Sequence, residues 1–326
     1  MEPITNHLLP LPDELVKADW DKKIEHLYEQ QLKNWHDAKH NYKQFQSVKR
    51  RSIDFDDFRI DLQYNPARER STCADLHPNE IASRPCFLCS THLPEQQKGY
   101  AILNKYLLLI NPFPIFENHL TISDFHHLPQ SISGRIIDML TLAKDLQSYT
   151  IFYNGPRCGA SAPDHFHFQA IPKNSLPVDT EFDYLKKYKC KLLVNEDDIE
   201  IVQVKYYLRK MVAFESEYRE PIDYFFTKVF QQLPFDEASD EPMMNVLANY
   251  QNGKYRLMLF LRNKQRPSCY YMDDPERIMV SPASVEMGGI MVTPREEDFV
   301  KITKENLKEI YNETCMNLNI NDILNI

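Results

Sequence analysis

The sequence is poor in glycine and has no long apolar run. Only seven of its 326 residues are glycine, so each glycine is expected at a tight turn or where the backbone closely approaches another group. The most apolar segment, residues 101–116, contains two asparagines, a lysine and two prolines, which excludes a membrane-spanning helix there. The charged N-terminus lacks an apolar core, and we therefore expect no signal peptide.

Charge and cysteine content narrow the class of protein further. The formal net charge is −9, which excludes a broad basic surface for nucleic acid but leaves room for a local basic pocket. Seven cysteines, an odd number spread through the chain, do not form the pattern of a disulfide-stabilised secreted domain. With 43% hydrophobic and 26% charged residues, the composition is that of a globular protein, and we expect it in the cytoplasm.

The first half of the sequence combines helix and strand patterns. Residues 13–45 are rich in helix formers with apolar residues near helical spacing, which predicts one long amphipathic helix with Asp13 as its N-cap. A second helix is predicted at 130–147. The predicted strands lie in IDLQY, in the hairpin YAILNKYLLLINP, and in HLTIS, TIFYN and HFHFQAI.

The second half repeats this order. Strands are predicted at about 192–195 and 199–208, a helix at about 222–233, and two further strands in MNVLANY and YRLMLFLR around the turn Asn252-Gly253. The segment 236–242 reads as a surface loop, and a last helix covers about 303–316. Helix, strand, loop and strand thus occur twice, which favours an internal duplication. A coincidental order of elements is the alternative.

The segment HFHFQAIP, residues 165–172, carries the strongest chemical signal. In a strand, His165, His167 and Gln169 share one face, and the two phenylalanines lie on the other face, towards a core. A neutral imidazole whose second nitrogen is held by an acceptor is a nucleophile suited to phosphorus. Solvent-exposed decoration of an edge strand is the alternative.

Polar groups just upstream fit an anion site. Asn154, Ser161 and the backbone around Gly159 are potential hydrogen-bond donors to phosphate oxygens.

The segment NGPRCGASAPDHFHFQA resembles the active-site signature of the histidine-triad superfamily in its transferase and phosphorylase branch, and NPFPIFENHLTISDFHHLPQSI is similar to the segment that precedes it in GDP-hexose phosphorylases. The resemblance implies that His167 attacks the α-phosphorus and carries a covalent nucleotidyl group, while Gln169 holds a non-bridging oxygen. His165 would orient the nucleophile or bind a metal.

The family also implies a fold and a reaction. We expect an α+β protein made of two histidine-triad-like halves, each an antiparallel sheet with packed helices, after an N-terminal helical extension. The expected ranges are 1–60, 61–178 for the catalytic half and 179–326 for a degenerate half. Phe166 stands where uridylyltransferases typically have proline, which favours a phosphorylase. Gln169, where hydrolytic branches have histidine, favours group transfer.

A Cys-x-x-Cys pair, Cys86 and Cys89, has the spacing of two ligands of a tetrahedral zinc site. The resemblance to uridylyltransferases implies His127 and His165 as the other two ligands of a structural zinc ion. His126 is the alternative to His127, and His92 is a weaker candidate. A redox pair or two buried thiols would explain the cysteines without a metal.

Basic residues and glycines in both halves are candidates for binding the nucleotide and the sugar. In the first half these are Asn65, Arg68 and Arg70, since arginine suits bidentate binding of phosphate. In the second half they are Arg262, Lys264 and Arg266 after a predicted strand, and Gly288 and Gly289 as a glycine-lined wall. Solvated surface charge is the alternative for the basic residues.

The sequence therefore predicts a nucleotidyltransferase. The preferred reaction is transfer of a nucleoside monophosphate from a nucleotide sugar, such as a GDP-hexose, to phosphate. Alternatives are a hexose-1-phosphate nucleotidylyltransferase, in which a sugar phosphate is the acceptor, a dinucleoside polyphosphate phosphorylase, and a non-catalytic nucleotide-binding protein. The sequence does not determine the oligomeric state, but the relatives are often dimers, which makes a homodimer a candidate. No membrane or nucleic-acid partner is expected.

Overall fold

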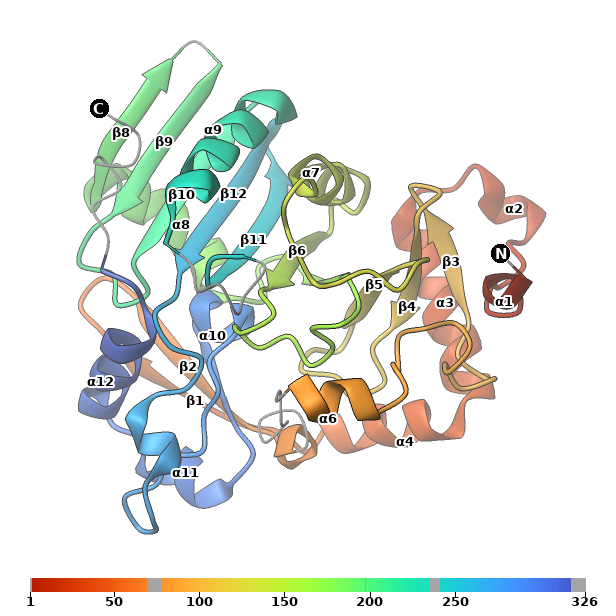
Figure 1. Cartoon of the computed structure of the whole chain (residues 1–326), viewed down its shortest axis with the longest axis horizontal. Helices are drawn as coiled ribbons and strands as arrows, with labels where there is room; N and C mark the ends of the chain where they lie inside the picture. The colour runs from red at the N-terminus through yellow and green to blue at the C-terminus, as the bar shows by residue number, and fades with distance from the viewer. Residues whose placement is uncertain (1, 70–77, 197, 235–240, 318–326) are drawn as a thin grey trace.

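The computed structural model describes residues 2–69, 78–196, 198–234 and 241–317. Its centre is a ten-stranded sheet in the order β3-β4-β5-β7-β6-β11-β12-β10-β9-β8 (Figure 1). All nine neighbouring pairs are antiparallel. The strands are β3 Gly99–Ile102, β4 Tyr106–Ile110, β5 Leu120–Asp124, β6 Tyr149–Asn154, β7 His167–Pro172, β8 Cys190–Glu196, β9 Ile199–Val204, β10 Met211–Ser216, β11 Met244–Gln251 and β12 Lys254–Leu261.

The sheet consists of two halves with the same topology. From its outer edge inward, the first half runs β3-β4-β5-β7-β6, and the second half runs β8-β9-β10-β12-β11 from the opposite edge. In each half a helix connects the strands that are third and fourth in chain order. Helix α7, Ile136–Asp145, connects β5 to β6, and α9, Arg219–Gln232, connects β10 to β11. The halves join where β6 pairs with β11. This confirms the α+β fold of two similar halves.

Several predicted boundaries need correction or stay predictions. The strand predicted at 199–208 ends at Val204, and a strand that we did not predict, β10, follows it. Helix α8, Pro177–Tyr188, spans the expected domain limit at residue 178, and the limits after residues 60 and 178 stay predictions. The loop predicted at 236–242 lies largely outside the described residues.

The predicted long N-terminal helix is broken into three. They are α2 Asp13–Val16, α3 Trp20–Asn34 and α4 His36–Phe45. Asp19 rather than Asp13 caps the long helix α3, because its side chain accepts a hydrogen bond from the Lys22 N–H. Trp35 is extended, with φ −122° and ψ 99°, and its side chain is buried. Burial of this indole favours a bend over a continuous helix.

Each face of the large sheet has its own apolar core. On the first face, α3, α7 and α9 pack against the strands, and Phe166 and Phe168 are buried there. On the second face lie α8, α10 (Ser284–Gly288), α12 (Lys304–Thr314) and a small sheet. The small sheet has the order β1-β2-β13, with β1 Lys49–Asp54, β2 Arg59–Tyr64 and β13 Ile290–Thr293. The remaining helices are α1 Glu2–Thr5, η1 Pro66–Arg68, α6 Pro78–Ser83, η2 Ser268–Tyr271 and α11 Glu296–Lys301.

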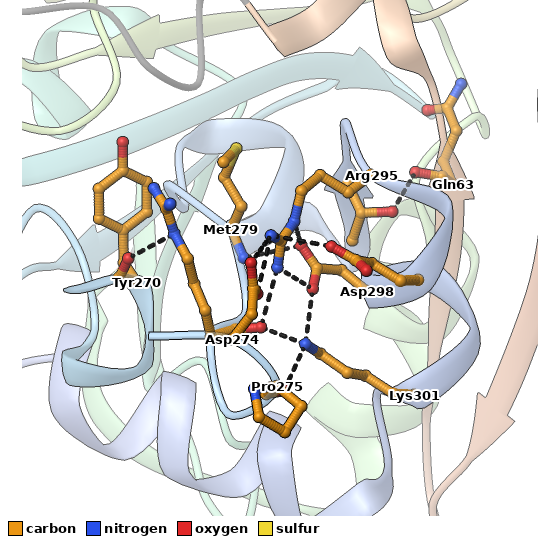
Figure 2. Close-up of polar contacts among 11 residues, drawn as sticks. Gln63, Tyr270, Asp274, Pro275, Met279, Arg295, Asp298 and Lys301 are labelled. Carbon is orange, nitrogen blue, oxygen red and sulfur yellow. Dashed lines mark hydrogen bonds and ion pairs between the residues drawn. The ribbon is translucent and has the colours of Figure 1, made fainter. Parts of the chain in front are cut away.

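A network of ion pairs fixes α11 beside the small sheet. Figure 2 shows Arg295 and Lys301 converging on Asp298. The buried Asp298 carboxylate lies 2.8 Å from Arg295 Nε and 3.0 Å from Lys301 Nζ, and it accepts the Met279 N–H at 2.9 Å. Arg295 also binds Asp274. The network therefore ties the segment 274–279 to α11, the helix after β13. Strand β13 pairs in parallel with β2, and β2 leads into η1.

Among the described residues, we find no helix with the length and apolarity needed to cross a bilayer.

Candidate functional site

Strand β7 presents the predicted catalytic pair to the second face of the sheet. Phe166 and Phe168 are buried in the core of the first face, so the alternation of the strand turns His167 and Gln169 to the other face. Their partners on β5 are Ser123 and Thr121. His165, which we predicted on the same strand face as His167 and Gln169, is not part of it. Strand β7 begins at His167, and the ring of His165 turns to the cysteines instead.

The His167 imidazole is held in one tautomer. Its Nδ1 lies 2.9 Å from the His165 carbonyl oxygen, which only accepts, so Nδ1 carries the proton and Nε2 keeps its lone pair. The side chain is almost fully buried, and this burial lowers the pKa of His167 to about 4. The ring is therefore neutral near pH 7 and has a nucleophilic nitrogen.

The side chain of Gln130 separates β6 from β7 at this histidine. The ladder between these strands ends at the pair Phe152 and Gln169, and two pairs further on in the same register Asn154 would face His167. There, Gln130 Oε1 accepts the His167 N–H at 2.8 Å, and Gln130 Nε2 donates to the carbonyls of Asn154 and His167, both at 3.0 Å. Gln130 replaces the ladder and opens the sheet at His167. A lone glutamine in a loop gives no sequence signal for this role.

Gln169 is oriented by a residue that we did not predict, His119. The Gln169 Oε1 atom accepts from His119 Nε2 at 2.8 Å, and Asn111 Nδ2 lies 3.5 Å from the same oxygen. The fully buried His119 accepts the Ile115 N–H on its other nitrogen at 3.3 Å. With its oxygen occupied, the Gln169 carboxamide offers its N–H groups to a ligand.

Four predicted metal ligands come together in one cluster. The donor atoms of Cys86, Cys89, His127 and His165 all lie within 4.8 Å of one another. His165 Nδ1 is 3.4 Å from Cys86 Sγ and 3.5 Å from Cys89 Sγ, and His127 Nδ1 is 3.1 Å from Cys89 Sγ. Two sulfurs and two imidazole nitrogens are the donor set of structural zinc sites. The cluster fits a zinc ion.

A second layer of contacts directs His165 Nδ1 to the cysteines. The other ring nitrogen, Nε2, lies 2.9 Å from the Asp124 carbonyl oxygen and 3.1 Å from Ser123 Oγ. Nε2 therefore carries the proton, as is usual for a histidine that binds metal through its other nitrogen. Since the His165 carbonyl also holds the ring of His167, one residue links the cluster to that imidazole.

The other histidines considered for this site lie outside the cluster. His126 points outward, with its side chain 76% exposed and 3.4 Å from an Asp124 oxygen. His92 contacts the Cys86 carbonyl at 3.1 Å. A hollow of about 650 Å³ lined by Arg84, His92 and Asp164, among others, opens beside the cysteines.

Arg262 corrects one of our predictions. It is fully buried, and its guanidinium donates to Thr314 O, Asn245 Oδ1, Pro282 O, Lys264 O and Gln265 O. These five acceptors match the five N–H donors of an arginine, so none remains for a phosphate. Arg262 is a structural residue.

The remaining second-half candidates also have other partners. Lys264 pairs with Glu313 at 2.9 Å, and Arg266 lies over the Tyr270 ring and 3.4 Å from Ser281 Oγ. The two glycines allow close packing: a Cβ at Gly288 would lie 2.5 Å from a Leu176 methyl carbon, and one at Gly289, which has φ +112°, would lie 2.7 Å from Arg209 Nη1. The predicted glycine wall for a ligand is therefore corrected to a packing contact.

Two first-half candidates lie at the end of β2. Asn65 is buried and donates to the Pro114 carbonyl at 3.2 Å. Arg68 donates to the Phe113 carbonyl at 3.4 Å and is close enough to His119 for its charge to act on that ring. Arg70 lies outside the described residues. Among the described candidates of this segment, Arg68 is thus the residue whose positive charge acts on the His119 ring.

The loop between β6 and β7 is built against α10. Asn154 Oδ1 accepts the Ser284 N–H at 2.8 Å and lies 3.1 Å from Asn245 Nδ2. Gly159 has φ +98°, and a Cβ there would lie 2.3 Å from Ala283 Cβ, so only glycine fits. Ser161 is exposed, and its carbonyl accepts from Arg84 at 3.2 Å.

Comparisons with known proteins agree with this geometry. The model of the domain of unknown function DUF4922 matches residues 27–172, and the model described as GDPGP1-like, C-terminal domain, matches residues 184–319. No curated protein matches the chain significantly in sequence.

Solved structures of a yeast enzyme share the fold. Yeast Ap4A phosphorylase Apa2 in complex with AMP has 14% identity and a TM-score of 0.55, over 89% of this chain and 97% of that one. The same enzyme in complex with Ap4A has 16% identity and a TM-score of 0.53 over the same shares. At this identity the likeness establishes the fold.

Proposed function

We propose a nucleotidyl-transfer function from the premise that the chain has a GDPGP1-like C-terminal domain and the fold of the histidine-triad transferases and phosphorylases. The proposed activity is that of a nucleotide-sugar phosphorylase, with a GDP-hexose as the substrate that the GDPGP1-like match favours. The observation that carries the proposal is the His167 ring, neutral and held through Nδ1, beside a carboxamide that offers N–H groups.

The reaction has two displacements. First, the lone pair of His167 Nε2 attacks the α-phosphorus, a P–N bond forms, the P–O bond to the distal phosphate breaks, and hexose 1-phosphate leaves. Then an oxygen of inorganic phosphate attacks the same phosphorus, the P–N bond breaks, and a nucleoside diphosphate leaves. The proton stays on Nδ1 and keeps its hydrogen bond to the His165 carbonyl. This bond stabilises the positively charged ring of the intermediate. Gln169 donates to a non-bridging oxygen.

Arg68 is the residue that we propose for the phosphate charge. Its positive charge acts on the His119 ring, and arginine binds phosphate oxygens in a fixed fork. Asn154, Gly159 and Ser161 stay candidates for shaping the site through the loop between β6 and β7.

We also propose that Cys86, Cys89, His127 and His165 hold a structural zinc ion. The ion would supply a rigid crosslink between the Cys86–Cys89 turn, the segment after β5 and the segment before β7. Through the His165 carbonyl, this crosslink would keep the His167 ring in register.

A second candidate reaction is phosphorolysis of a dinucleoside polyphosphate. It is favoured by the fold shared with yeast Ap4A phosphorylase over 89% of the chain, and it uses the same nucleophile with a different leaving group. Transfer to a sugar phosphate differs only in the acceptor. Product analysis with GDP- and UDP-hexoses and Ap4A, each with phosphate or hexose 1-phosphate, separates the three reactions.

The proposal is tested by trapping the nucleotidyl-histidine. Incubation with a GDP-hexose or with Ap4A, without an acceptor, is expected to raise the intact mass by one nucleoside monophosphate. His167→Ala is expected to abolish the adduct, because it removes the attacking nitrogen. His126→Ala, which removes an exposed imidazole of the same segment as the metal cluster, is the matched control and is expected to keep it. An adduct that survives His167→Ala, or none with any donor, would refute the proposal.

A further inference from the structure

A directed series of hydrogen bonds runs from the small sheet to Gln169. The Gln63 side chain on β2 donates to the Ile115 carbonyl at 3.0 Å. Ile115 in turn donates its N–H to His119 Nδ1 at 3.3 Å, and His119 Nε2 donates to Gln169 Oε1 at 2.8 Å. Every donor points in the same direction, towards the nucleophile.

The series settles the proton position on His119. The Ile115 N–H only donates, so Nδ1 of the ring must accept and Nε2 must carry the hydrogen. That hydrogen in turn requires an oxygen, which assigns the oxygen and nitrogen of the Gln169 carboxamide. Burial, together with the charge of Arg68, lowers the pKa of His119 to about 3, so the ring stays neutral at working pH.

The ring is fixed independently of any ligand. It stacks on Phe152 with centroids 6.0 Å apart and meets the edge of Phe116 at 6.4 Å. The backbone carbonyl of His119 accepts hydrogen bonds from the hydroxyls of Tyr28 at 2.8 Å and Tyr42 at 3.3 Å. The position of the Nε2–H is therefore set before a substrate arrives.

We propose that His119 is a positioning residue whose Nε2–H holds the oxygen of Gln169, so that the Gln169 N–H groups face the phosphate held beside His167. The inference rests on the proposed function and deepens it. Without this bond only the long contact from Asn111 Nδ2, at 3.5 Å, holds the oxygen, and a half-turn of the carboxamide would direct its oxygen lone pairs at an anion. Electrostatic repulsion would then oppose the charge that develops on the phosphate oxygens.

Three substitutions distinguish the contributions of the two ring nitrogens of His119 from that of the stacked ring itself. His119→Gln can place an N–H close to the position of Nε2 and keep the bond to Gln169. His119→Asn can reach the Ile115 N–H but not Gln169, and His119→Phe keeps the stacked ring without either bond. We expect the asparagine and phenylalanine variants to lower the rate of nucleotidyl transfer to His167 by about 10- to 100-fold. His119→Gln is expected to stay within a few-fold of the unmodified protein.

A double-mutant cycle with Gln169→Ala tests whether His119 acts through Gln169. In that background, His119→Asn is expected to cause no further loss of rate, because the group that it positions is gone. Losses that multiply, or a His119→Gln variant as slow as His119→Asn, would overturn the proposal. Thermal unfolding of each variant identifies any that fails to fold. If His119→Phe fails to fold, the comparison of His119→Asn with His119→Gln still tests the proposal.

A readout without activity distinguishes failure of this inference from failure of the proposed function. ¹⁵N NMR of the unmodified protein is expected to show His119 as the neutral Nε2–H tautomer, and His119→Asn is expected to shift the side-chain amide signals of Gln169. The Nδ1–H tautomer, or amide signals that do not move, would contradict the positioning role even in a chain that transfers no nucleotide.

Discussion

At the residue scale, the role of a basic side chain in this protein depends on what already occupies its N–H groups. Arg262 and Lys264 follow the same strand, and the sequence alone makes them equally good candidates for phosphate. The structure separates them, because Arg262 is fully buried against five acceptors while Lys264 is half exposed in one ion pair. The first is part of the fold, and the second is part of the surface.

Arg262→Met is therefore expected to lower the free energy of unfolding by about 3 kcal/mol or more, because it leaves several buried acceptors without a donor. Lys264→Ala, which removes only a surface ion pair, should cost less than about 1 kcal/mol. Equilibrium unfolding in urea measures both. If Arg262→Met were as stable as the unmodified chain but had lost affinity for nucleotide, Arg262 would be a ligand residue after all.

The placement of His167 and Gln169 on one face of a strand could be predicted from sequence, whereas the contacts of His119 and Gln130 could not. The alternation of His167 and Gln169 with phenylalanines is local, and it determines which face of a strand each side chain takes. The roles of His119 and Gln130 depend on residues that lie 24 to 50 positions away in the sequence. No local pattern records such contacts.

At the element scale, strands and helices with strong periodicity were predictable, and short or interrupted ones were not. The hairpin of β3 and β4 and the helix α7 lie in the predicted segments. The break at Trp35 was missed because burial of one large side chain outweighs the helix propensity of its neighbours. Strand β10 is buried along its whole length and so lacks the alternation of a half-buried strand. It was absorbed into the loop after the predicted strand at 199–208.

The metal cluster joins three elements and yields a test at this scale. Cys86→Ser is expected to reduce bound zinc from about one ion per chain to well below one and to lower Tm, because it removes one of four ligands of a crosslink. Cys190→Ser is the matched control, since Cys190 lies outside the cluster and donates to the Lys186 carbonyl, a bond that serine can also make. Metal analysis of untagged protein and thermal unfolding provide the readouts. Full zinc retention by Cys86→Ser would exclude the proposed ligand set.

At the scale of the whole molecule, the two halves of the sheet have the same topology but differ in the side chains at corresponding positions. Strand β12 occupies in the second half the place of β7 in the first. On the second face of the sheet it presents Met258 and Phe260, both buried in an apolar core, where β7 presents His167 and Gln169. The second copy instead supplies support, since Asn245 and Arg262 form hydrogen bonds that reach Asn154 and the segment before α10.

This asymmetry predicts one covalent nucleotide per chain. Intact-mass spectra at saturating donor should show a single added nucleoside monophosphate, because methionine and phenylalanine offer no nucleophile for the second site. Peptide mapping of the trapped protein should locate the adduct on the peptide that contains His167. Two additions per chain, or a labelled peptide from the second half, would be inconsistent with a degenerate copy.

The short peptide from His127 to Gln130 connects two fixed points. One end contributes to the cysteine and histidine cluster, and the other separates β6 from β7. The length of this peptide is thus set at both ends by contacts made elsewhere in the molecule. An inserted or deleted residue there would shift one end by more than the length of a hydrogen bond, so this stretch should tolerate changes of side chain at its two middle positions far better than any change in the number of residues.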